Sequence, residues 1–148
     1  MHRRDFIVAA LATTVLAKAA HAAGPRILVA KSPTCGCCGA WIDRMRDAGF
    51  AVDARDVDQD TLYALKAQLG IGPEHASCHT AQVDGYVIEG HVPAQDIQRL
   101  LAERPDAAGL AVPGMPTGSP GMEMGDERDP YDTLLVRKDG SATVFAQH

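Results

Sequence analysis

The chain has 148 residues, of which 46% are hydrophobic and 22% are charged, and its formal net charge is −5. This length and composition fit one globular domain with a buried core and exclude a disordered chain. The acidic balance, without a basic patch or an aromatic stacking platform, argues against nucleic acid as a partner.

The first residues predict a cleaved signal peptide at 1–22. Two arginines near the start precede an apolar run at 6–16, and small residues follow up to an A-x-A-like cleavage site at Ala22. The run is shorter than the roughly 20 apolar residues of a transmembrane helix, so we expect no stable membrane span. We predict export to the periplasm, by the twin-arginine route or by an ordinary Sec signal, and a mature domain at 23–148.

Strands and helices alternate in the first half of the mature chain. Apolar runs predict buried strands, and apolar residues at helical spacing predict helices that end at glycine. In chain order these are a strand at 27–30, a helix from Trp41 that Gly49 ends, a strand at 50–52, and a helix capped within 58–60 that Gly70 ends.

Two hairpins and a long loop are predicted in the second half. Alternating residues at 80–83 and 86–89 around Asp84-Gly85 indicate a hairpin, and Pro93 opens a third helix that ends before Pro105. We expect a loop at 109–129, rich in proline and glycine, and a final hairpin from 133–136 and 142–145. The order β-α-β-α-β-β-α predicts an α/β, thioredoxin-like fold with a central mixed sheet, flanking helices and a C-terminal hairpin extension.

The four cysteines of the chain are predicted to form one thiol site. Cys35, Cys37 and Cys38 follow the first strand, where a helix N-terminus would lower thiol pKa values and favour the thiolate. Cys78 lies just before the first hairpin, a connection that packs beside the same helix end in the thioredoxin arrangement. Because Cu(I) prefers sulfur ligands at low coordination number, and adjacent thiolates bridge several such ions, the cluster predicts a site for one or more copper ions (Cu⁺).

Other soft or borderline donors lie near these cysteines in the sequence. His79 and His91 are candidate imidazole ligands, with positions outside the coordination sphere as the alternative. The loop at 109–129 carries candidate thioether ligands, which would otherwise only pack the loop: Met115, Met122 and Met124.

Three alternatives to copper binding stay open from the residues alone. The cysteines would also suit two structural disulfides in a protein-binding module, or zinc, which the tight C-x-C-C spacing makes the less favoured metal. They would also suit an enzyme, a copper or thiol–disulfide oxidoreductase in which Cys35 attacks and Cys38 resolves. The proline that usually faces such a pair is absent from Ser77-Cys78-His79, which counts against general disulfide exchange.

The chain resembles domain-of-unknown-function family 411, the CopG-type proteins encoded with bacterial copper-resistance systems. The resemblance extends from 27 to 145 and rests on four segments, 31–39, 77–80, 85–93 and 109–116. It implies a periplasmic, thioredoxin-like protein that binds Cu(I) through Cys35, Cys37, Cys38 and Cys78 and interconverts copper and thiol redox states. Its implied partners are copper ions, periplasmic copper-resistance proteins and a reductant.

Overall fold

The computed structural model describes residues 24–148, so the predicted signal peptide lies outside the described part of the chain. Within residues 24–148, no helix combines the length and the apolar character needed to cross a membrane. In chain order the elements are β1 (Arg26–Lys31), α1 (Gly36–Asp47), β2 (Ala51–Asp56), α2 (Gln59–Gln68), the 3-10 helix η1 (Pro73–His75), β3 (His79–Val83), β4 (Tyr86–Glu89), α3 (Ala94–Glu103), β5 (Gly109–Ala111), β6 (Asp132–Val136) and β7 (Ala142–Gln147).

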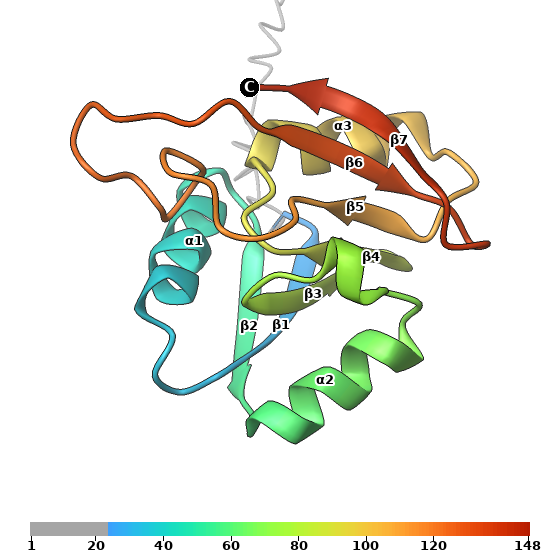
Figure 1. The fold of residues 1–148 in the computed structure, drawn as a ribbon, viewed down its shortest axis with the longest axis horizontal. Coiled ribbons are helices and arrows are strands. Elements are labelled where there is room, and N and C mark those ends of the chain that lie inside the picture. The colour runs from blue at the N-terminus through green and yellow to red at the C-terminus, as the bar shows by residue number, and fades with distance from the viewer. Residues whose placement is uncertain (1–23) are drawn as a thin grey trace, which may run out of the picture.

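All seven of these strands form one mixed sheet in the order β2-β1-β3-β4-β5-β6-β7 (Figure 1). The β1–β2 and β4–β5 pairs are parallel, and the other neighbours are antiparallel. The predicted α/β class, mixed sheet and C-terminal hairpin are therefore confirmed. The hairpin of β6 and β7 does not stand apart, because β5 connects it to the central strands.

The helices cover both faces of the sheet, and the alternation of side chains along each strand separates the two sides. Ala81 and Ile88 are register partners on one face, where they share a core with apolar residues of α1 and α3. Their neighbours Thr80 and Glu89 are also partners and face α2, where Lys66 contacts both. The sheet thus lies between α1 and α3 on one side and α2 on the other.

Local sequence explains the turns and one of the helix caps. Asp84 and Gly85 have φ values of 53° and 87°, so the β3–β4 hairpin uses the turn for which Asp-Gly is favoured. Asp58 caps α2 by accepting a hydrogen bond from the backbone N–H of Thr61 at 2.7 Å, as predicted. Trp41 is fully buried and donates its indole N–H to the Val92 carbonyl at 2.9 Å, which ties α1 to the segment before α3.

Two predicted boundaries are wrong. The first helix begins at Gly36 and not at Trp41, so Cys37 and Cys38 lie in its first turn and not before it. Glycine has a poor helix propensity, and the periodic apolar pattern starts only at Trp41, so the sequence obscures this turn. The expected loop also starts too early, because 109–111 forms β5, which is too short to show an alternating pattern and exists through its pairing with β4 and β6.

Candidate metal centre

The N-terminal end of α1 carries three of the four cysteines. Cys35 is the residue before the helix, its backbone is extended, and its side chain makes no capping hydrogen bond. Cys35 and Cys38 are joined in a disulfide, while Cys37 and Cys78 are free. Cys38 is fully buried, whereas Cys35 and Cys37 are half-buried, so two of the three residues are partly accessible to solvent.

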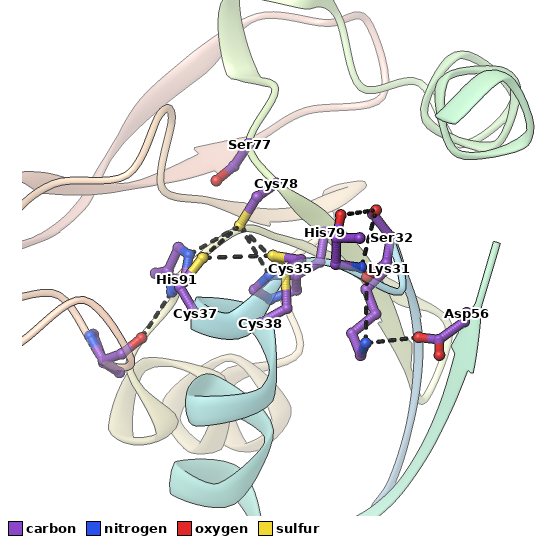
Figure 2. Close-up of a disulfide and its surroundings, with 12 residues drawn as sticks. Lys31, Ser32, Cys35, Cys37, Cys38, Asp56, Ser77, Cys78, His79 and His91 are labelled. Carbon is purple, nitrogen blue, oxygen red and sulfur yellow. Dashed lines mark hydrogen bonds and ion pairs between the residues drawn. A yellow bond between two sulfur atoms is a disulfide. The ribbon is translucent and has the colours of Figure 1, made fainter. Parts of the chain in front are cut away.

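Cys78 completes the cluster from a segment 40 residues beyond Cys38 in sequence. Its Sγ lies 3.5 Å from Cys38 Sγ and 3.9 Å from Cys37 Sγ, and Cys37 Sγ lies 3.5 Å from Cys35 Sγ. Figure 2 shows the Cys78 sulfur directed at the helix end and at His91. All four sulfurs lie within 4.8 Å of one another, so the fold brings the four predicted residues into one potential metal site.

His91 lies against the same sulfur and has a defined tautomer. Its Nδ1 is 2.8 Å from the Pro120 carbonyl, and because a carbonyl only accepts hydrogen bonds, Nδ1 carries the proton. The unprotonated Nε2 therefore faces Cys78 Sγ at 3.0 Å. Burial lowers the pKa of His91 below its usual value, which favours the neutral ring that a metal ligand needs.

His79 approaches Cys78 from the other side, within the core. Its Nδ1 is 3.5 Å from Cys78 Sγ, and its ring packs on Trp41 with the ring centroids 4.4 Å apart. Burial, followed by the charges of His91 and Lys66, lowers the pKa of His79 well below 6.5, so its ring is also neutral. The Nε2 atom of His79 is buried without a hydrogen-bond partner among the described residues. The two histidines form with Cys78 a second group of closely spaced donors.

The pKa of the Cys78 thiol is not lowered in the way that a helix N-terminus would lower it. Burial, followed by the charge of Cys37, raises the pKa of Cys78 from 9.0 to about 12. The thiolate predicted for the cysteines at the helix N-terminus does not extend to Cys78, because this residue lies outside α1. In the metal-free protein Cys78 is therefore a neutral thiol, and a bound metal would have to displace its proton.

A buried polar network lies behind Cys78 and was not predicted from the sequence. Glu89 and Lys66 form an ion pair whose side chains are 0% and 4% exposed, and Thr80 donates a hydrogen bond to Glu89 Oε2 at 2.7 Å. Burial raises the pKa of Glu89, and the Lys66 charge opposes this effect. One signal was available: Lys66 follows Leu62 by four residues and so lies on the inward face of α2.

The β5–β6 loop, which extends toward α1 in Figure 1, lies against the helix end. A Cβ atom built on Gly121 would be 2.8 Å from the Cys37 carbonyl, so only glycine allows this approach. Met122 follows directly and is half-buried, whereas Met115 and Met124 are 52% and 66% exposed. The loop thus brings the segment that carries Met122 beside the cysteine-bearing end of α1.

Comparison with known proteins gives the family. The family model described as "Protein of unknown function, DUF411" matches residues 75–122. Two solved structures of a copper resistance protein copG, forms 2 and 1, are each 45% identical to the chain with a TM-score of 0.78. The alignments cover 84% and 83% of this chain and 98% and 96% of those chains, while no curated protein matches. The chain therefore belongs to the DUF411 family of CopG-type proteins.

Proposed function

We propose that this protein binds Cu(I) in the periplasm as part of copper handling and resistance. The ligands would be the thiolates of the cysteine cluster, which consists of Cys35, Cys37, Cys38 and Cys78. His91 or His79 would be an auxiliary imidazole ligand. The observation that carries the proposal is the gathering of four sulfur atoms, from two distant segments, within 4.8 Å of one another.

The donor set suits a soft cation at low coordination number. Thiolates select Cu(I), and sulfurs this close can bridge more than one ion, so a multinuclear site fits as well as a single ion. The lone pair of His91 Nε2 faces the Cys78 sulfur and adds a neutral donor. Four thiolates would also suit zinc, but the C-x-C-C spacing differs from the paired C-x₂-C motifs of structural zinc sites.

The similar structures support the role in copper handling, and the order of elements supports a thioredoxin-like fold. The two similar structures are of a copper resistance protein, and we extend copper handling to this chain on that basis. The strand order β2-β1-β3-β4, with α1 following the first strand, supports a thioredoxin-like first part. Periplasmic export rests on the predicted signal peptide at 1–22.

Anaerobic titration of the fully reduced mature domain with Cu(I), against a competing chelator, tests the proposal. We expect tight uptake that protects all four thiols from alkylation, and sharply weaker uptake after Cys78→Ser. Gln68→Ser, on the exposed side of α2, is the control and should bind as the unmodified protein does. Absence of uptake by the reduced protein would refute copper binding, and an unchanged affinity in Cys78→Ser would remove Cys78 from the site.

One observation favours a second function, thiol–disulfide or copper redox chemistry. The Cys35–Cys38 disulfide joins a half-buried residue to a buried one, as expected if Cys35 attacks a substrate disulfide and Cys38 resolves the mixed disulfide. The same two thiols could reduce two Cu(II) ions to two Cu(I) ions, releasing two protons and forming this disulfide. Either reaction needs a reductant to restore the thiols.

A disulfide-exchange assay separates this function from simple metal storage. We expect the reduced protein to reduce a peptide disulfide, and Cys35→Ser to abolish the reaction, if the chain is an oxidoreductase. The third alternative, a disulfide-stapled binding module, requires that all four cysteines be bonded. The free state of Cys37 and Cys78 argues against it.

A further inference from the structure

The connection that carries Cys78 is held by the side chain of Glu89. The backbone N–H of Ser77 donates a hydrogen bond to Glu89 Oε1 at 2.7 Å, and the Ser77 hydroxyl donates to the Gly114 carbonyl. No peptide bond in the described residues is cis, so this connection lacks the cis-proline that usually faces the reactive pair in thioredoxin-like enzymes. The Ser77 N–H belongs to the Ala76–Ser77 peptide, one residue before the thiol, so its hydrogen bond fixes the chain immediately before Cys78.

Glu89 is itself fixed by partners on two other elements. Oε1 also pairs with the Lys66 ammonium from α2, and Oε2 accepts the hydroxyl of Thr80 on β3 at 2.7 Å. Lys66 donates a further hydrogen bond to Thr80 Oγ1 at 2.8 Å. The carboxylate therefore has three partners, the Ser77 N–H, the Lys66 ammonium and the Thr80 hydroxyl. Because Lys66 and Thr80 are also bonded to each other, they hold the carboxylate toward Ser77.

A buried ion pair of this kind needs an explanation other than stability. Removing two charges from water is unfavourable, and well-packed apolar residues often stabilise a fold as well or better. An ion pair is retained more readily where it specifies one geometry. Here the geometry concerns Cys78, whose sulfur lies 3.5 Å from Cys38 Sγ and 3.9 Å from Cys37 Sγ. A displacement of about 1 Å would take it out of a shared metal site.

We infer that Glu89 is a positioning residue for Cys78, and that Lys66 and Thr80 hold its carboxylate in place. This inference deepens the proposed metal site and rests on it for its biological meaning. The Glu89 backbone adds to the arrangement, because its carbonyl accepts a hydrogen bond from the Val112 N–H at 3.0 Å. Lys66 on α2 thus holds Glu89, Glu89 holds the Ser77 amide, and the Ser77 amide fixes the chain that carries the Cys78 thiol.

Two double variants that differ in the hydrogen-bonding group offered to Ser77 and Thr80 test the inference. Lys66→Met with Glu89→Gln removes both charges but keeps a carbonyl oxygen for the Ser77 N–H. Lys66→Met with Glu89→Leu removes both charges and the acceptor. We expect the Leu variant to bind Cu(I) about 10- to 100-fold more weakly than the Gln variant, a range typical for groups that orient ligands. Thermal unfolding of both variants controls for a general loss of structure.

A copper-free measurement keeps this inference separate from the proposed function. With the Cys35–Cys38 disulfide intact, phenylarsine oxide should bridge Cys37 and Cys78 in the unmodified protein and in the Gln variant, and at least about tenfold less in the Leu variant. Equal capture by the Gln and Leu variants would overturn the positioning role, whatever the result for copper. Absence of copper binding with unequal capture would refute only the metal function.

Hydrogen exchange in the unmodified protein provides a test that does not depend on how the variants fold. The Ser77 amide precedes β3 and has no backbone acceptor within residues 24–148, so its protection would come from Glu89. We expect its exchange to be slowed by at least about 100-fold relative to an unstructured amide. Exchange at the unprotected rate would refute the hydrogen bond on which the inference rests.

Discussion

The β5–β6 loop passes close to the α1 backbone at Gly121, and replacing this glycine tests whether the loop supports the site. A Cβ atom there would lie 2.7 Å from the Trp41 backbone nitrogen and 2.8 Å from the Cys37 carbonyl oxygen, at a φ of +88°. Gly125 lies on the same loop with a φ of +62°, and a Cβ atom there meets nothing within 4 Å. Gly121→Ala and Gly125→Ala therefore share the backbone strain but not the clash.

The two variants should differ by an amount that follows from these contacts. An alanine at positive φ is disfavoured by about 1–2 kcal/mol at either position. At Gly121 the obstructing atoms belong to the α1 backbone, so the loop must move, and the 2.8 Å hydrogen bond between His91 and the Pro120 carbonyl is lost. Leaving a buried partner unsatisfied costs about 1–3 kcal/mol. We expect Gly121→Ala to lose about 2–5 kcal/mol of unfolding free energy and Gly125→Ala about 1–2.

Chemical unfolding followed by the fluorescence of the single tryptophan, Trp41, measures both variants in the same way. Trp41 is buried beside the contact, so its emission reports the relevant part of the fold. The Gly121 variant should also bind Cu(I) more weakly, because His91 loses the carbonyl that fixes its tautomer. Equal destabilisation of the two variants would show that the loop does not pack closely against the helix end, and it would refute a role of the loop in the site.

Three further predictions follow from individual contacts. In a variant that keeps Cys78 as its only cysteine, alkylation should accelerate with an inflection above pH 9, because burial raises the thiol pKa; an inflection near 8.5 would contradict this. Trp41→Phe should lower the unfolding free energy by about 1–3 kcal/mol, since the Val92 carbonyl loses its buried donor, and urea denaturation would measure the loss. His148→Ala, which removes the ring whose Nε2 lies 2.8 Å from buried Asp96 but keeps the backbone hydrogen bonds to Tyr131, should cost about 1 kcal/mol, and a Tm unchanged in calorimetry would refute that contact.

Much of the fold was accessible from local patterns. The Asp84-Gly85 turn requires two residues that tolerate positive φ, and this chemistry predicts the β3–β4 hairpin without reference to the rest of the chain. The cap at Asp58 is also local, because the acceptor and the N–H of Thr61 are three residues apart. Signals of this kind are weaker for β5, whose three residues are a strand only because β4 and β6 flank them.

The sequence by itself determined the chemical nature of the candidate site: four soft sulfur donors, two imidazoles, and a helix close to the first three cysteines. The tertiary structure gave the distances between Cys78 and the other sulfurs, and it alone decided that His91 presents Nε2 to Cys78 and that Glu89 and Lys66 form a buried ion pair. The physical reason is that residue type and spacing encode local conformation and ligand preference. Burial, pKa and hydrogen-bond partners arise from contacts between segments that are distant along the chain.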